Sequence, residues 1–225
     1  MSIRPISTVL ALLLLLPVSA ATAADIQGDG ALSVGASEPE GNFTHYAETG
    51  LTGIGRLSIH FPGAGMFSAW TTLTGALFDS ESSDVDVFVD GYRTSAERTT
   101  TESGFALHGG LQLGSSTRRG FLRPRGAFGI GIWMFNTSLT YTMSGQEEPF
   151  IGESDTDWKF GWRANGGLDL FFRTSWGIAL DVAYDHVFDM EHRIVVDDNG
   201  DSWDLSQPAR YLTVTVGAVW PVGRI

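Results

Sequence analysis

The chain contains eight stretches in which apolar and polar residues alternate, and the connections between these stretches are alternately short and long. Alternation with a period of two predicts β-strands whose two faces meet different surroundings. Short turns on one side, long loops on the other and an even number of strands are typical of a β-barrel that spans a membrane. The predicted strands cover residues 29–37, 51–61, 65–78, 102–114, 121–142, 158–172, 176–189 and 207–222.

The connections predict the orientation of this barrel. If the chain starts in the periplasm, all the short turns lie there and all the long loops face outward. Residues 85–92 also alternate, but a ninth spanning strand would break the even count, so we expect them to extend the second long loop above the membrane. The short turns are residues 62–64, 115–120 and 173–175, and the long loops are residues 38–50, 79–101, 143–157 and 190–206.

Each predicted strand has a polar face, and the alternation alone does not decide whether this face points inward. The other face carries aromatic residues near the strand ends, as in the interfacial girdles of membrane barrels, which favours lipid outside. The expected girdle residues are Phe61, Phe105, Trp176, Phe188 and Trp220. The polar residues expected to fill the lumen are Arg56, His60, His108, Arg125, Arg163, Asp169, Asp181 and Asp185. Residues 65–78 leave open whether Phe67 or Trp70 faces lipid.

A soluble, lipocalin-type barrel is the opposite arrangement, with the apolar face inside around a ligand. The chain lacks the early Gly-x-Trp motif of that family. Cell fractionation separates the two hypotheses, because only a membrane barrel would be found in the membrane pellet.

Residues 1–24 resemble a secretory signal peptide, with Arg4, an apolar run and a small-residue stretch before the expected cleavage site. The apolar run is too short for a membrane-spanning helix, which needs about 20 residues. Residues 25–225 are then predicted to form one β-barrel domain. The absence of cysteine excludes disulfides and thiolate metal sites. The net charge of −12 argues against nucleic-acid binding, which needs clustered cations.

Two glycine-rich stretches, residues 123–131 and 160–170, resemble strands of the OmpA/OmpX/OmpW-like superfamily of small outer-membrane β-barrels. In that family an aromatic residue commonly follows the proline of the first stretch, whereas this chain has Arg125 after Pro124. The resemblance implies an all-β, eight-stranded, antiparallel, up-and-down barrel in the outer membrane of a Gram-negative-type bacterium. It also implies contact with outer-membrane lipid and lipopolysaccharide.

The C-terminal residues resemble the signal that the barrel-assembly machinery reads in such proteins. The matching residues are Thr215, Gly217, Trp220 and Val222, although many such proteins end on an aromatic residue and this chain ends on Ile225. The resemblance therefore implies the assembly machinery as a partner.

An eight-stranded barrel is just wide enough for side chains to fill its interior. Buried charges are costly unless they are paired, so the near balance of arginines and aspartates predicts a structural network in the lumen. A narrow channel for small solutes through the same residues is the alternative. The long loops carry a net charge of −16 by residue count. We expect a non-enzymatic envelope or surface-interaction protein without a cofactor, whose extracellular partner the sequence does not reveal.

Two further hypotheses concern the loops. Asp197, Asn199 and Asp201 have oxygen ligands at spacings that partly match a calcium loop, but the sixth-position glycine and late glutamate of an EF-hand are missing. The residues His45, Asp79 and Ser80 supply the residue types used by barrel enzymes that modify lipid A. Such catalysis requires these side chains to lie within hydrogen-bond reach of one another.

Overall fold

The computed structural model describes residues 27–41, 44, 47–61, 66–78, 81–89, 92–114, 121–143, 151–173, 175–195 and 202–223. The predicted signal peptide lies outside these residues. Among the described residues, no helix has the length and apolar character needed to cross a membrane. The described strands are β1 (Gln27–Glu40), β2 (Gly50–His60), β3 (Phe67–Leu77), β4 (Glu81–Val89), β5 (Tyr92–Gly114), β6 (Leu122–Met143), β7 (Ile151–Arg173), β8 (Trp176–Val195) and β9 (Ser202–Val222).

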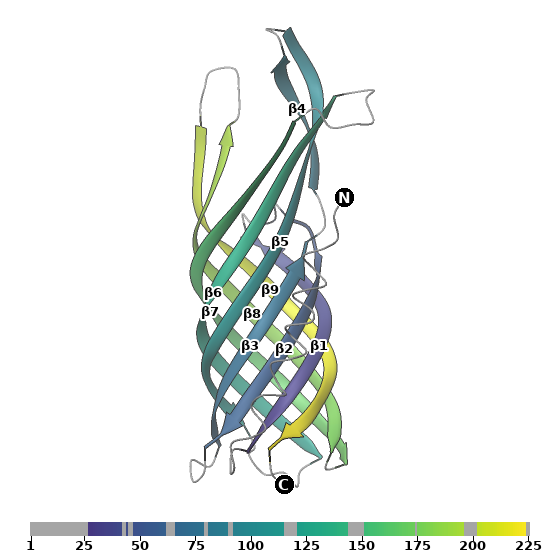
Figure 1. The fold of residues 1–225 in the computed structure, drawn as a ribbon, viewed down its shortest axis with the longest axis vertical. Coiled ribbons are helices and arrows are strands. Elements are labelled where there is room, and N and C mark those ends of the chain that lie inside the picture. Colours follow the sequence, from purple (N-terminus) through teal and green to yellow (C-terminus); the bar gives the residue numbers. More distant parts are fainter. Residues whose placement is uncertain are drawn as a thin grey trace.

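Eight of these strands close into an antiparallel barrel. Each pairs with its neighbour in the order β3-β2-β1-β9-β8-β7-β6-β5, and a direct β3–β5 pairing closes the ring. β4 pairs only with β5, above the level at which β3 ends (Figure 1). The predicted eight-stranded barrel is therefore confirmed, and residues 85–89 extend the sheet as part of a projecting hairpin.

The register gives the barrel its tilt. The register can be followed once around the ring by stepping from each residue to the one paired with it on the next strand. A path that starts at Glu40 of β1 crosses all the other barrel strands and returns to β1 at Gly30. This offset of 10 residues, from 40 to 30, corresponds to a strand tilt of about 40° for eight strands. Figure 1 shows that the strands are inclined to the long axis of the barrel.

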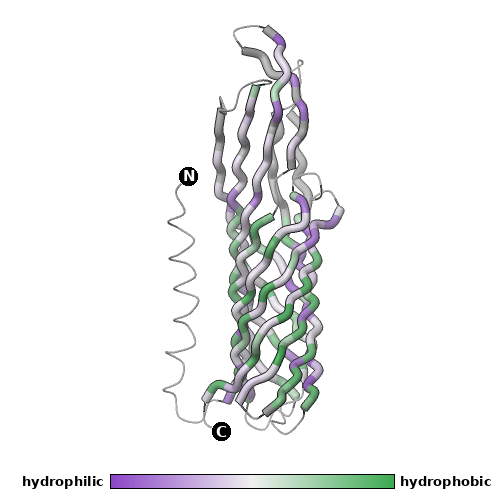
Figure 2. Tube along the Cα trace, turned by 90° about the vertical axis from the view of Figure 1, so that its right-hand side faces the viewer, coloured by the Kyte–Doolittle hydropathy of each residue, from purple (hydrophilic) through white to green (hydrophobic). Residues whose placement is uncertain are grey.

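Four strands extend far beyond one of their predicted ends. β5 begins at Tyr92 and not near residue 102, β7 begins at Ile151 and not near 158, β8 ends at Val195 and not near 189, and β9 begins at Ser202 and not near 207. Beyond the apolar band the outward face of each strand is polar as well, so the alternation stops while the backbone pairing continues. Most of the predicted loops 79–101, 143–157 and 190–206 are therefore hairpin extensions of the barrel strands (Figures 1 and 2).

Pro208 lies inside β9 and not at its start, and a bulge makes this possible. Val187 of β8 pairs with Ala209, but the next pair is Met190 with Gln207, so β8 has an extra residue opposite Pro208. The missing N–H of a proline is tolerated at such a bulge.

The apolar faces point outward. On β8, Leu180, Val182 and Phe188 are 41–49% exposed, whereas Ala179 and Asp185 are fully buried. On β3, Phe67 is 51% exposed and Trp70 is 3% exposed, which settles the face that the alternation left open. The lipocalin-type arrangement is therefore wrong, because its apolar side chains would point inward. Figure 2 shows the apolar residues as a band around the barrel below the polar hairpins.

The height of this band fits a bilayer. The outward aromatic residues Trp176 and Phe188 mark its two edges on β8 and are 12 residues apart. With about 3.4 Å per residue and a tilt of about 40°, this spacing corresponds to roughly 30 Å. That value is close to the thickness of a bilayer's hydrocarbon core.

Candidate functional site: the filled lumen

The barrel lumen gathers the charged residues of the membrane-spanning part. All eight predicted lumen residues point inward, and six of them, namely Arg56, His108, Arg125, Arg163, Asp169 and Asp185, are at most 8% exposed. Asp29 and Arg123, which the sequence analysis did not include, join them. These two groups together supply four arginines and four aspartates, and Glu102 of β5 is a further acid that is fully buried inside the barrel and accepts a hydrogen bond from Thr137.

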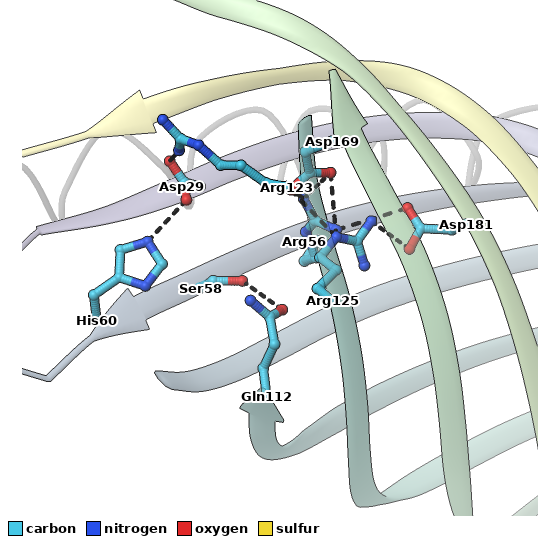
Figure 3. A network of polar contacts seen from close by, with 9 residues as sticks. All are labelled: Asp29, Arg56, Ser58, His60, Gln112, Arg123, Arg125, Asp169 and Asp181. Atoms are coloured by element: carbon cyan, nitrogen blue, oxygen red, sulfur yellow. Dashed lines mark hydrogen bonds and ion pairs between the residues drawn. The ribbon is translucent and has the colours of Figure 1, made fainter. Parts of the chain in front are cut away.

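Two arginines and two aspartates form a cluster in the half of the barrel away from the hairpins (Figure 3). Arg56 Nη2 donates to both carboxylate oxygens of Asp169, each at 3.0 Å. Arg125 Nε donates to the same two oxygens at 3.1 and 3.2 Å. Asp181 contacts both guanidinium groups, with ion pairs of 2.5 Å to Arg125 and 3.7 Å to Arg56. Each charge therefore has two partners of opposite sign, which offsets the cost of removing it from water.

A second group closes the end of the barrel opposite the hairpins. His60 Nε2 lies 2.8 Å from Asp29 Oδ2, and Arg123 Nη1 lies 3.9 Å from Asp29 Oδ1. The guanidinium of Arg123 also stacks 4.0 Å above the ring of Phe171. Phe171 belongs to a buried apolar layer with Ala31, Ala179 and Val219.

A third group lies deeper in the lumen around Arg163. This arginine pairs with Asp185 through two parallel contacts, Nε to Oδ1 at 2.9 Å and Nη2 to Oδ2 at 2.8 Å. Its Nη1 donates to Thr74 Oγ1 at 2.7 Å. Such a bidentate pair is among the strongest charge-assisted hydrogen bonds in proteins.

The Arg163 group also contains a hydroxyl, an imidazole and a carboxylate that contact one another in a row. Thr72 Oγ1 lies 3.1 Å from His108 Nδ1, and His108 Nε2 lies 3.5 Å from Asp185 Oδ1. This order is the one used in nucleophilic catalysis. However, Thr72 is 3% and His108 is 1% exposed, so a substrate has no access to the hydroxyl. At this burial the three side chains pack against one another inside the barrel.

An aromatic layer fills the lumen on the side of the hairpins. Trp133 Nε1 donates to Tyr211 Oη at 2.5 Å, and the Trp133 ring meets His108 edge-on with centroids 4.3 Å apart. Phe78 and Phe135 complete the layer, and Ala47 from the β1–β2 connection packs against it. Side chains thus occupy the lumen from the Asp29 group to this layer.

The girdle residues lie on the outer surface. Phe61, Trp176 and Phe188 are 44–51% exposed, and Phe105 and Trp220 are half-buried. The Trp220 ring covers Gly30 of β1, where a Cβ atom would lie 3.1 Å from the indole. Of the predicted assembly signal, Thr215 points into the lumen and Val222 ends β9. The role of these residues in assembly stays a prediction.

Other predicted sites lie outside the described residues. These are the calcium candidates Asp197, Asn199 and Asp201, and the enzyme candidates His45, Asp79 and Ser80. Within the described part of the chain, no three acidic, histidine or cysteine side chains are grouped so that they could hold a metal ion.

Some lumen residues were missed for identifiable reasons. Arg123 shares its face with Arg125, two residues later, but it lies close to the start of the predicted strand 121–142. Asp29 is the first residue of the first predicted strand, where alternation has no preceding residues to support it. Trp133 and Tyr211 lie on the same strand faces as polar residues. They were not predicted to point into the lumen because only polar residues were expected there.

No protein-family model matches the sequence, and no curated protein matches it. Solved structures do match: Neisserial surface protein A is 8% identical with a TM-score of 0.51, and the match covers 86% of this chain and 96% of that one. The chain has the fold of the small eight-stranded outer-membrane β-barrels. At this identity the similarity concerns the fold alone.

Two further similar structures come from other bacteria. A major outer membrane protein from Thermus thermophilus is 12% identical with a TM-score of 0.48, over 86% of this chain and 99% of that one. Ail, the attachment invasion locus protein of Yersinia pestis, is 11% identical with a TM-score of 0.46, over 86% and 98%.

Proposed function

We propose that the protein is a non-enzymatic, non-conducting barrel of the outer membrane that holds long hairpins at the cell surface. Its role is structural within the envelope or lies in contacts made by the hairpins. The observation that carries this proposal is the filled lumen, in which four arginines and four aspartates pair with one another beneath an aromatic layer.

The filled lumen favours a plug over a channel. Conduction requires binding groups that a solute reaches and leaves. Here Arg163 and Asp185 are at most 1% exposed and make a bidentate contact with each other, and Trp133 lies next to His108 at 1% exposure. A passing ion would have to break several of these contacts at once.

The hairpins favour a surface role because they extend well beyond the apolar band. β4 and the first part of β5 form a hairpin whose exposed side chains include Asp84, Asp86 and Glu97. Acidic side chains outside the membrane produce a local field that attracts cationic partners.

Conductance in planar lipid bilayers tests the plug. The wild-type protein is expected to give no stable unitary conductance. A narrow channel would instead give stable steps that Arg163→Ala abolishes. Arg93→Ala is the matched control, because Arg93 lies on the exposed hairpin and pairs with Asp86 there. Steps in the wild type that are lost in Arg163→Ala but kept in Arg93→Ala would replace this proposal with the channel.

Trypsin treatment of intact cells tests the location and orientation. The side chain of Arg93 is 60% exposed on the projecting hairpin, whereas the lumen arginines are buried. Cleavage of the β4–β5 hairpin in intact cells, with the barrel recovered in the outer-membrane fraction, is expected. Protection of the hairpin until the outer membrane is permeabilised, or recovery of the protein in the soluble fraction, would contradict the proposal.

A further inference from the structure

The outer surface of the barrel carries a platform of aromatic rings on β6, β7 and β8. The indole of Trp162 stacks on Phe128 at 5.8 Å, contacts Tyr184 at 5.5 Å and stacks nearly parallel to His186 at 5.4 Å and 13°. Phe188 meets His186 edge-on at 5.2 Å. An ionisable side chain at membrane depth is costly, and such residues usually have a function.

The platform leads directly to two charged residues at the membrane surface. His186 pairs in register with Arg210 of β9, and Arg210 pairs with Glu40 of β1. Because the strands are tilted by about 40°, each step to the next strand raises the position by about 3 Å. Trp162, His186, Arg210 and Glu40 therefore lie at successively higher levels, around the level of the girdle residue Phe188.

Arg210 on β9 and the acids Glu38 and Glu40 on β1 mark the edge of the apolar band on their strands. The outward residues of β9 below Arg210 are Leu212, Val214 and Val216, which carry no charge. On β1, Val34 and Ala36 precede Glu38 and Glu40. This is the depth at which lipid headgroups meet a membrane protein.

Two opposite charges thus lie side by side without forming a direct ion pair. Arg210 and Glu40 are both exposed and directly paired across the strands. Among the described residues, neither side chain takes part in an ion pair of 4.0 Å or less. Glu38, also exposed, lies two residues from Glu40 on the same face. The site therefore offers both a donor for an anion and an acceptor for a cation.

We propose that Arg210 and Glu40, next to the stacked rings of His186 and Trp162, bind the headgroup of a lipid that carries both a phosphate and a primary ammonium, as in phosphoethanolamine. The planar guanidinium of Arg210 matches a phosphate group in two hydrogen bonds. Glu40 accepts hydrogen bonds from the ammonium, and Trp162 packs against the part of the lipid below the headgroup. The inference depends on the proposed placement in a membrane and adds a lipid preference to it.

The neighbouring charges distinguish this headgroup from others. A lipid with a phosphate and no ammonium meets repulsion from Glu38 and Glu40. A quaternary ammonium, as in phosphocholine, has no N–H group to donate to Glu40. We therefore expect a preference for the phosphoethanolamine lipid over both.

Native mass spectrometry of the detergent-solubilised barrel tests this preference. The probe is an equimolar mixture of phosphatidylethanolamine, phosphatidylglycerol and phosphatidylcholine with identical acyl chains. Retention of phosphatidylethanolamine is expected to exceed that of each other lipid by about fivefold. Arg210→Gln should remove this excess, Arg210→Lys should keep part of it, and Glu40→Gln should remove the discrimination against phosphatidylglycerol. Arg93→Gln, above the membrane, is the control and should retain the wild-type preference.

Equal retention of the three lipids, the same loss in the control variant, or a lipid-free dimer through this face would overturn the inference. Heat-modifiable gel mobility verifies that every variant is folded. A barrel that inserts into vesicles but shows no lipid preference contradicts only the lipid site. A barrel that does not insert into vesicles contradicts the proposed function itself.

Discussion

The membrane-spanning part and the projecting hairpins use the same strands in different surroundings. In β5, Leu107, Leu111 and Leu113 point outward and are 50–60% exposed, while His108 and Gln112 point into the lumen. Above Phe105 the same strand continues with Ser103, Thr101 and Thr99 on the outer face, and it stays paired with β6 as far as Ala96. Alternation of apolar and polar residues therefore shows that the two faces of a strand meet different surroundings. The strand itself continues where both faces are polar.

The same contrast applies to charge. In the lumen each aspartate has an arginine partner within 3.9 Å, and the contacts are buried. On the hairpin, Asp84 pairs directly across the strands with Glu97, another acid, and both are exposed. Water screens the second arrangement and not the first. A substitution should therefore have a large effect in the barrel and a small effect in the hairpin.

The largest effect is expected for Arg163→Ala. It leaves Asp185 fully buried without its bidentate partner, which should lower the free energy of unfolding by about 3–5 kcal/mol. Arg93→Ala breaks an exposed ion pair with Asp86 and should cost at most about 1 kcal/mol. Urea unfolding of the barrel in lipid vesicles measures both. Similar losses in the two variants would remove the distinction between barrel and hairpin.

A charge on the outer surface should have the next largest effect. Val182 is 49% exposed midway along the band on β8, and Val182→Arg should cost about 2–4 kcal/mol if this surface meets lipid. Thr101 is an outward residue of β5 above the band, and Thr101→Arg should change stability by less than about 0.5 kcal/mol. The same unfolding experiment compares them, and a harmless Val182→Arg would mean that water reaches the band.

Substitutions at two adjacent glycines of β7 allow the inside of the barrel to be compared with its outside. A Cβ atom on Gly167 would lie 2.6 Å from the guanidinium of Arg125, whose position is fixed by Asp169 and Asp181. Gly167→Ala should therefore cost about 1–3 kcal/mol. A Cβ atom on Gly166 meets nothing within 4 Å, and Gly166→Ala should be neutral or slightly stabilising. Equal unfolding midpoints for the two variants would contradict the packed lumen.

The smallest effect concerns the paired acids of the hairpin. Glu97→Gln removes the repulsion of Asp84, which amounts to about 0.2–1 kcal/mol for like charges on neighbouring strands. Amide hydrogen exchange in β4 and the first part of β5 should slow by up to about fivefold, while global unfolding stays unchanged. Added salt should have the same effect on the wild type. Faster exchange in the variant would show that Glu97 stabilises the hairpin.

The sequence predicted the barrel well because each spanning strand carries the same two-faced pattern. It placed Arg163 and Asp185 on the lumen faces of their strands, because each alternates regularly with leucine, valine and aromatic residues. It did not predict which charges pair, because Arg56 and Asp169 are 113 residues apart and meet only when the ring closes. Trp70 remained unassigned because large apolar residues occur on both faces of β3.

The hairpin extensions were not predicted as strands because both of their faces are polar. The exception is residues 85–92, where valine and aspartate alternate outside the membrane. That pattern alone would have suggested a ninth spanning strand, and the even strand count gave the correct placement. The ring platform around Trp162 was also missed, since it depends on contacts between three strands.

Oxygen and nickel accessibility of spin labels along the outer face of the barrel tests the central claim most directly. The chain contains no cysteine, so single cysteines can be introduced at Ile178, Leu180, Val182 and Tyr184 on β8, and at Thr99 and Thr101 on the hairpin. With the barrel in vesicles, the ratio of oxygen to nickel accessibility should peak at Leu180 and Val182 and be low at the hairpin sites. A ratio as low at Val182 as at Thr101 would show that the apolar face does not contact lipid, and would contradict this account.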